Sequence, residues 1–269
     1  MLLVAQSPVQ SNQDILDWGH AGVVGFTWHA FKAAYITPLL KKPNLDPVNV
    51  QSYRPIFNLS VLSKLLERLV ARQLLDYLST SKLLPDLQSA YRAHHSTDTA
   101  VVKVLTDILK ALDVGDLTML MLLDLSATFD TVDHAILLRR LVSSYGFREC
   151  VLAWFTSYID SRTHFVHCGA FKSVPTVVLC GVPQRSVLGP ILFLLSTVDL
   201  AQLIQGYDLH PHLYADDTQI YGTCHPSKAA VLREKMSACV DDVASWMRSN
   251  LLQLNTAKTE VLWCATSRR

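Results

Sequence analysis

The sequence is short of charge and of glycine. Charged residues make up 17% of the 269 residues, apolar residues make up 50%, and glycine occurs only 10 times. Ordinary globular domains carry about 25% charged residues, so this composition indicates a large buried core and excludes global disorder and collagen-like repeats. The formal net charge of +1 argues against a strongly basic nucleic-acid-binding arm, although it leaves room for a local basic groove.

The six cysteines lack the spacing of a zinc ribbon or of a disulfide framework. They lie far apart and contain no C-x-x-C pair: Cys150, Cys168, Cys180, Cys224, Cys239 and Cys264. Such a spread is typical of reduced thiols in an intracellular protein. The first ten residues, MLLVAQSPVQ, also lack the basic start and the long apolar run of a secretory signal. We therefore expect a protein of the nucleus or cytoplasm that is not secreted.

Long apolar runs and metal-ligand clusters are missing as well. The most apolar run, residues 117–125, is too short to span a membrane and contains Asp124, so no membrane association is expected. The segment 210–225 holds three histidines and one cysteine, but no second ligand pair stands at zinc-finger spacing. We expect no structural zinc.

Apolar periodicity predicts a mixture of helices and strands. Helices are expected over 60–78, 96–113, 134–144, 149–159, 190–204 and 228–249, and strands over 35–40, 117–125, 164–168, 172–179, 210–213, 218–221, 251–254 and 260–263. The three-four spacing predicts these buried faces: Leu62, Leu65, Leu66, Leu69, Val70, Leu74 and Leu78 on the first helix, and Val101, Leu105, Ile108, Leu109 and Leu112 on the second. Without a strict strand–helix–strand repeat, the fold class is α+β.

Aspartates on apolar strands are the most informative feature. Asp124 lies inside the most hydrophobic predicted strand, and Asp216 and Asp217 are adjacent at the tip of a predicted hairpin. Carboxylates that converge from neighbouring strands would form an oxygen-rich site suited to Mg²⁺, and two such ions can drive phosphoryl transfer. The residues alone leave a second interpretation open, because paired aspartates are common in turns, where they bond their own backbone.

Six motifs in a fixed order resemble one protein family. They are YRPI at 53–56, QSAYR at 88–92 with HST at 95–97, DLSATFDTVDH at 124–134, GVPQ at 181–184, YADD at 214–217, and LN at 254–255 with KTE at 258–260. In this order and spacing they resemble the reverse transcriptase of non-long-terminal-repeat (LINE-type) retrotransposons. The resemblance runs from about residue 35 to the end of the chain.

The resemblance implies a right-hand polymerase with fingers and palm, an antiparallel palm sheet flanked by helices, and no thumb. The expected divisions are an irregular segment over 1–35, fingers over 36–115 and 146–185, and palm over 116–145 and 186–269. The implied activity is RNA-directed DNA polymerisation by two-metal nucleotidyl transfer. The implied cofactors are two Mg²⁺ ions, for which Mn²⁺ can substitute, and the implied partners are an RNA template, a DNA primer and deoxynucleoside triphosphates.

The resemblance also implies roles for single residues. Three aspartates are implied as catalytic residues and metal ligands: Asp124, Asp216 and Asp217. Arg92 would contact the triphosphate, because a guanidinium forks onto phosphate oxygens. Phe129 would lie under the incoming sugar and exclude a 2′-hydroxyl, Gln184 would touch the template–nucleotide pair, and Lys258 would face the pyrophosphate. Outside the family, these four are an ordinary loop arginine, core phenylalanine, loop glutamine and surface lysine.

The sequence departs from the family pattern at several positions. Arg185 stands where the motif has a glycine, and its long side chain is expected to block a tight pocket. Positions 90, 93 and 94 lack the glycine and proline residues that would shape the loop presenting Arg92. Phe57 replaces a small polar residue, Thr256 and Ala257 replace a Pro-Asp pair, and no thumb follows the palm. These departures predict impaired activity.

Two other functions stay open at this point. One is a non-catalytic retroelement remnant of the same fold that binds RNA weakly or not at all. The other is a two-metal cyclase or phosphodiesterase, which also places carboxylates on adjacent strands. The second alternative leaves the segments around Arg92 and Gln184 without a purpose.

Overall fold

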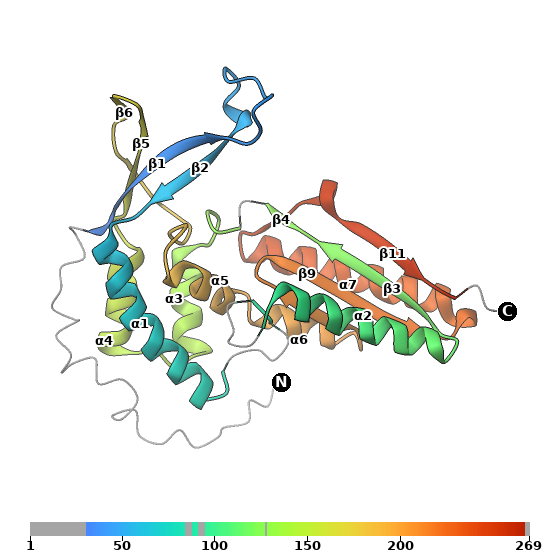
Figure 1. Cartoon of the computed structure of the whole chain (residues 1–269). Coiled ribbons are helices and arrows are strands. Elements are labelled where there is room, and N and C mark those ends of the chain that lie inside the picture. Colours follow the sequence, from blue (N-terminus) through green and yellow to red (C-terminus); the bar gives the residue numbers. More distant parts are fainter. Residues whose placement is uncertain (1–30, 84–87, 91–94, 127, 267–269) are drawn as a thin grey trace.

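A computed structural model describes residues 31–83, 88–90, 95–126 and 128–266, which form a five-stranded sheet, a four-stranded sheet, a two-stranded pair and seven α-helices (Figure 1). The strands are β1 Ala33–Leu40, β2 Tyr53–Asn58, β3 Leu117–Leu123, β4 Leu125–Ser126, β5 Thr163–Cys168, β6 Phe171–Lys172, β7 Thr176–Val177, β8 His210–Tyr214, β9 Asp217–Cys224, β10 Gln253–Leu254 and β11 Glu260–Cys264. The helices are α1 Val61–Thr80, α2 Thr97–Asp113, α3 His134–Ser143, α4 Glu149–Ile159, α5 Leu188–Ser196, α6 Asp199–Gln205 and α7 Ala229–Ser249. The α+β class is confirmed.

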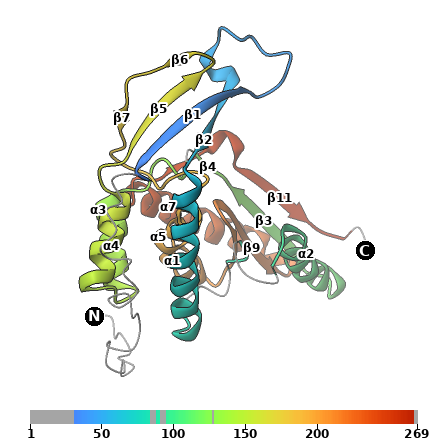
Figure 2. The same cartoon turned by 60° about the vertical axis from the view of Figure 1, so that its left-hand side comes forward.

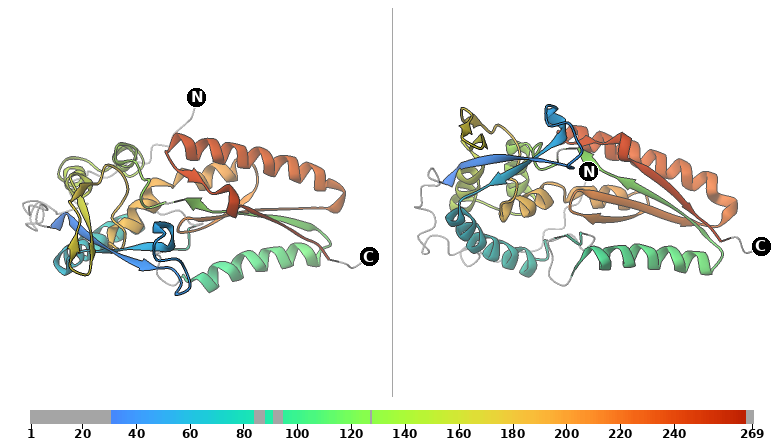
Figure 3. Two further views of the ribbon diagram at one scale, coloured as in Figure 1. Left: turned by 90° about the horizontal axis from the view of Figure 1, so that it is seen from above. Right: turned by 45° about the horizontal axis from the view of Figure 1, so that its top comes forward.

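The four-stranded sheet has the strand order β11-β3-β9-β8, and all its neighbouring strands are antiparallel. Figure 3 shows α7 and α2 on opposite faces of this sheet. The sheet needs cover on both faces because β3 reads LTMLMLL and is largely buried. α7 supplies one cover with a regular row of buried residues: Leu232, Met236, Cys239, Val243 and Met247.

The five-stranded sheet has the order β2-β1-β5-β6, with β7 also paired to β5. Figure 2 shows it projecting above α1, α3 and α4. Aromatic side chains fill the core below it: Trp154 and Tyr158 of α4 stack with ring centroids 5.4 Å apart. The strands of this sheet come from residues 33–58 and 163–177, so β1 begins three residues before the range 36–115 predicted for the fingers.

Polar side chains fix three of the helix starts. Ser60 accepts a hydrogen bond from the Ser63 N–H, Ser96 forms a capping box with Thr99, and Asp133 accepts from the Ile136 N–H. Each satisfies an N–H group that a helix start leaves without an internal partner. Short polar residues directly before an apolar repeat therefore mark these boundaries in the sequence.

The buried face of α1 differs from the predicted one. Leu62, Leu65 and Leu69 are exposed, whereas Ser63 and Glu67 are completely buried. The leucine spacing is correct for a helix, but the rotation of the helix depends on what the rest of the chain packs against it. Here the carboxylate of Glu67 binds the start of α5, and this contact turns the leucines outward.

The predicted face of α2 is correct in part. Ile108 and Leu112 contact the sheet as predicted, but Val101, Leu105 and Leu109 are exposed, and Val104, which was not predicted, is buried there. Because α2 has apolar residues on more than one side, periodicity alone could not select the side that meets the sheet.

The helix predicted over 190–204 is two helices. α5 ends at Ser196 and α6 begins at Asp199, because the Ser196 hydroxyl donates to the Phe193 carbonyl at 2.7 Å and competes with the helical pattern. By length and composition alone, Leu188–Gln205 could cross a membrane, with a mean hydropathy of 1.5. However, 67% of it is buried inside the protein, which is typical of a core helix.

Candidate active site

The register of the four-stranded sheet places three aspartates at neighbouring strand ends. Leu123, the last residue of β3, pairs with Thr218 of β9. Asp124 follows Leu123 and Asp217 precedes Thr218, so both lie at the same end of this antiparallel pair. Asp216 occupies the turn between β8 and β9. The predicted hairpin with acids at its tip is thus confirmed.

The turn that carries these acids is held from outside by a buried glutamine. Ala215 adopts a φ of +56°, in the left-handed region that residues with a side chain rarely occupy. The Gln88 Oε1 accepts hydrogen bonds from the N–H groups of Ala215, at 3.1 Å, and Ala90, at 3.0 Å. The sequence assigned Gln88 no role of its own, because no periodic pattern marks it. In the structure it forms an isolated bridge to Leu213.

Asp124 is bound by the segment that precedes β11. Lys258 Nζ lies 3.2 Å from Asp124 Oδ2, and the Asn255 side-chain amide donates to the same oxygen at 3.0 Å. The Asn255 N–H also donates to the Asp124 backbone carbonyl at 2.9 Å. The predicted Lys258 is therefore brought to the acids, and Asn255 is a further site residue that had no assigned role.

The three carboxylates act on one another electrostatically. The pKa of Asp217 is raised by partial burial and then by the negative charges of Asp216 and Asp124, while Lys258 lowers it. Asp216 Oδ2 accepts a hydrogen bond from the Thr128 hydroxyl at 3.2 Å. Burial and like charges both disfavour the ionised form, so this cluster concentrates negative charge that a cation would stabilise.

The donor set fits a divalent ion such as Mg²⁺, although it is not arranged as a finished cage. Across the described ranges, no three His, Cys, Asp or Glu side chains are grouped closely enough to hold a metal ion as they stand. The three aspartates nevertheless offer oxygen donors only, which Mg²⁺ and Mn²⁺ prefer. Asp216 and Asp124 also lie near enough to Asp217 to raise its pKa, in addition to the effect of burial.

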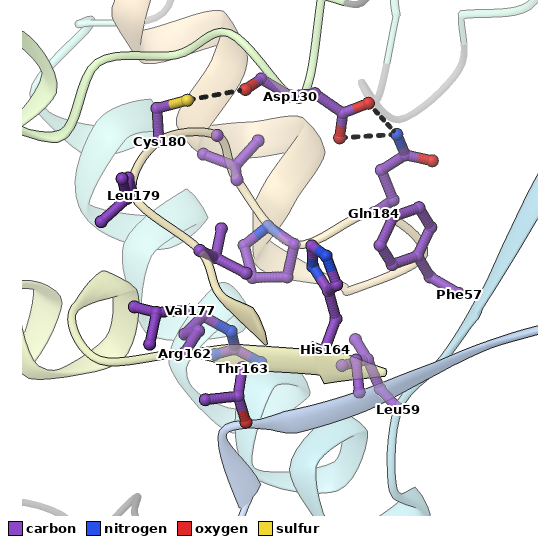
Figure 4. A pocket seen from close by; sticks show the side chains of 15 residues that line it. Phe57, Leu59, Asp130, Arg162, Thr163, His164, Val177, Leu179, Cys180 and Gln184 are labelled. Atoms are coloured by element: carbon purple, nitrogen blue, oxygen red, sulfur yellow. Dashed lines mark hydrogen bonds between the residues drawn. The ribbon is translucent and has the colours of Figure 1, made fainter. Parts of the chain in front are cut away.

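A second group of predicted residues is joined by two backbone hydrogen bonds. The Val182 N–H donates to the Phe129 carbonyl and the Gly181 N–H to the Val132 carbonyl, both at 2.7 Å. Gln184 Nε2 lies 2.8 Å from each carboxylate oxygen of Asp130, which orients its amide (Figure 4). The Phe129 ring packs against Phe193 with centroids 5.4 Å apart, so Phe129 also has the contacts of a core residue.

A pocket of about 380 Å³ adjoins this second group, between the five-stranded sheet and the loop of residues 177–184. Figure 4 shows Gln184 and Asp130 at one end and Arg162, Thr163 and Val177 at the other. Its walls are mainly apolar. None of the three aspartates of the sheet lines it, so the pocket borders the site and does not contain it.

Residues 40–267 match the protein family described as "Reverse transcriptase (RNA-dependent DNA polymerase)". The chain belongs to the reverse transcriptase family. The match covers every strand except β1, of which it includes only Leu40, and it contains all three aspartates, Gln184 and Lys258.

Relatives of this reverse transcriptase domain come from mobile elements of flies. The chain is 32% identical over 228 residues to "Probable RNA-directed DNA polymerase from transposon BS" of Drosophila melanogaster, covering 82% of this chain and 24% of that protein. It is 28% identical over 240 residues to the "RNA-directed DNA polymerase from mobile element jockey" of the same fly, covering 87% and 26%. The chain therefore spans about a quarter of these relatives, and the resemblance to LINE-type elements is confirmed.

Solved telomerase structures share the fold of the domain. Apo telomerase from Candida tropicalis, truncated from its C-terminal domain, superposes with a TM-score of 0.62 at 14% identity, covering 89% of this chain and 52% of that one. Telomerase from Candida albicans, in complex with a fragment of telomeric RNA, gives 0.55 at 14% identity, covering 88% and 42%.

Two further predicted positions of the reverse transcriptase domain need separate comment. Arg92 lies outside the described residues, so its role stays a prediction. Arg185 has a φ of +60° and an exposed side chain. The backbone thus keeps the left-handed turn that a glycine would adopt without strain, with arginine in its place.

Proposed function

We propose that this reverse transcriptase domain catalyses RNA-directed DNA polymerisation by two-metal nucleotidyl transfer. The observation that carries the proposal is the gathering of Asp124, Asp216 and Asp217 at one end of the β3–β9 pair, where their charges raise the pKa of Asp217. Divalent ions held by these carboxylates would activate the primer hydroxyl and stabilise the leaving pyrophosphate. The matched relatives named as RNA-directed DNA polymerases support the same assignment.

We assign Lys258 as the positively charged side chain that faces the leaving pyrophosphate. Its side chain is 68% exposed and yet its ammonium reaches Asp124 at 3.2 Å. A long, exposed side chain tied at the edge of the acid cluster can turn toward a phosphate without a large packing cost. In that position it can supply charge or a proton to the departing group.

Gln184 and Phe129 are assigned to the incoming nucleotide and its template partner. Asp130 fixes the orientation of Gln184, and the contact with Phe193 holds the Phe129 ring. Groups held this way keep their geometry when substrate binds, which limits the entropy lost in ordering them. Arg92 is assigned to the triphosphate from the family resemblance alone.

We propose further that Arg185 reduces this activity. Its left-handed backbone lies next to Gln184, and its flexible, charged side chain is exposed there. The same feature supports the second candidate function, a non-catalytic remnant of a retroelement that binds RNA weakly. In either case the RNA would be bound inside the cell, in the nucleus or cytoplasm.

Primer extension on an RNA template tests the proposal. The domain is assayed with Mg²⁺ or Mn²⁺, beside Asp216→Asn and the control Asp208→Asn. Asp208 carries a 93% exposed side chain paired with Lys235 away from the acid cluster. We expect Asp216→Asn to lose at least about 100-fold in rate, because the charge that stabilises the reacting groups is gone, and Asp208→Asn to extend normally.

Two results would contradict the catalytic proposal. One is extension that survives Asp216→Asn undiminished. The other is no extension by either the natural chain or Arg185→Gly; if salt-sensitive RNA binding then remains, the remnant function is supported.

A further inference from the structure

Glu67, in the middle of α1, is a completely buried carboxylate that binds the start of another helix. Its Oε2 accepts hydrogen bonds from the N–H groups of Val187, at 2.6 Å, and Leu188, at 3.2 Å. Its Oε1 accepts from the Ser63 hydroxyl at 3.0 Å. The carboxylate is thus committed to one arrangement, because buried acceptors that lose their donors are costly.

These contacts complete the capping of α5, for which the local sequence supplies only the Ser186 hydroxyl, the acceptor of the Gly189 N–H. Val187 precedes α5 and has no side chain able to cap it. The first N–H groups of a helix need outside acceptors, and a negative charge is favourable at that end. Glu67, 120 residues earlier in the chain, supplies both. The Tyr158 hydroxyl from α4 also neighbours Glu67 and Ser186, so several elements meet at this carboxylate.

The helix start held by Glu67 is also the end of the loop that carries Gln184. Within this loop the Ser186 hydroxyl donates to the Pro183 carbonyl at 2.5 Å and accepts from the Gly189 N–H at 2.7 Å. A Cβ at Gly189 would lie 2.5 Å from the Pro183 carbonyl oxygen, so the turn closes tightly on itself. Any shift of the start of α5 is therefore transmitted to the tip of the loop.

The loop of residues 183–186 is anchored on both sides, and the strained backbone of Arg185 requires these anchors. Upstream, Gly181 and Val182 are bonded to the segment 129–132. Downstream, Glu67 binds Val187 and Leu188. Between these anchors Arg185 keeps a φ of +60°, a conformation that persists only when the surrounding structure imposes it.

We infer that Glu67 is a positioning residue, which fixes the start of α5 and thereby holds Gln184 in place for the template–nucleotide pair. Its consequence for activity rests on the proposed polymerase function. Glu67 does not touch the reacting groups; it acts through the loop of residues 183–187.

The test compares Glu67→Gln, Arg185→Gly and the double variant, with Ser60→Ala as the matched control. Ser60 caps the same helix and does not contact the loop, so its loss weakens α1 without releasing Val187. We expect Glu67→Gln to raise the KM for the incoming nucleotide about 10-fold, the effect of one lost bond to a charged group, with kcat little changed. Ser60→Ala should leave KM unaltered.

The double variant separates positioning from general support of the fold. In the Arg185→Gly background the loop no longer has to be forced into a strained turn, so Glu67→Gln should raise KM only about 2- to 3-fold, a non-additive result. Equal effects of Glu67→Gln in both backgrounds, or a loss confined to kcat that tracks the folded fraction, would overturn the inference.

A second measurement does not depend on activity. Hydrogen exchange of the amides of residues 184–188 should become at least about 10-fold faster in Glu67→Gln, because these amides lose their anchor, while exchange in the middle of α7 stays the same. Unchanged exchange in the loop would refute the positioning role. If the natural chain and Arg185→Gly show no extension while loop exchange accelerates, the proposed polymerase function fails and the anchor stands.

Discussion

Replacing Arg185 by glycine should stabilise the protein. Arg185 has a φ of +60° and an exposed side chain. A residue with a Cβ in this region is disfavoured by about 1–2 kcal/mol, because the Cβ approaches the following carbonyl oxygen. Glycine avoids this cost but loses more backbone entropy on folding, by roughly 0.5–1 kcal/mol. The net effect is a stabilisation of about 0.5–1 kcal/mol, which raises the Tm by about 2 °C in a chain of this size.

Urea unfolding and thermal unfolding of the two proteins measure this difference. The matched control is Arg72→Gly, the same substitution at an exposed position inside α1. There the backbone is helical, so glycine should destabilise by about 1 kcal/mol. Opposite signs at the two positions follow directly from the two backbone conformations. If Arg185→Gly destabilised the protein as much as Arg72→Gly, the left-handed turn next to Gln184 would not exist and the strain argument would fail.

Two further predictions concern the site and the sheet. Gly181→Ala should destabilise the folded protein by about 3 kcal/mol, because φ is +93° and a Cβ would lie 2.8 Å from the Phe129 carbonyl oxygen. The control is Gly169→Ala, where φ is +60° and no atom lies near the new Cβ. In the same urea titration this control should cost only about 1 kcal/mol. Burial lowers the pKa of His212 below its usual value, so the unfolded chain takes up the proton first and stability should fall as the pH drops below about 6.5. His212→Gln should flatten this decline between pH 7.5 and 5.5, and an equal decline in both proteins would show that another group is responsible.

The carboxylate cluster illustrates how an unfavourable arrangement indicates function. Asp124, Asp216 and Asp217 are brought together by the sheet, although their mutual repulsion and partial burial raise the pKa of Asp217. A fold that needed only stability would separate such charges or pair each of them. Here Lys258 alone forms an ion pair with the cluster among the described residues. Perturbed groups gathered at one place are typical of functional sites.

The sequence by itself determined the position of the helices, the positions of several strands and the family. Caps such as Ser60 and Ser96 mark helix starts locally, and an almost continuous apolar run predicts β3 as a strand covered on both faces. The order of the motifs identified the family, and Asp124 within that apolar run indicated the acid cluster, although β3 ends at Leu123 and the strand β2 was not predicted. These features are encoded in neighbouring residues, which is why they can be read without the fold.

Only the tertiary structure decided which side of each helix is buried and what holds the site. Leu62, Leu65 and Leu69 of α1 were expected in the core beside Leu74 and Leu78, yet Glu67 and Ser63 lie there instead. The reason is that the N–H groups of Val187 and Leu188 need an acceptor, and Glu67 provides it. Gln88 and Asn255 likewise act on parts of the chain more than 120 residues away. Hydrogen bonds between distant segments depend on how the elements assemble in space, and no local pattern of residues records them.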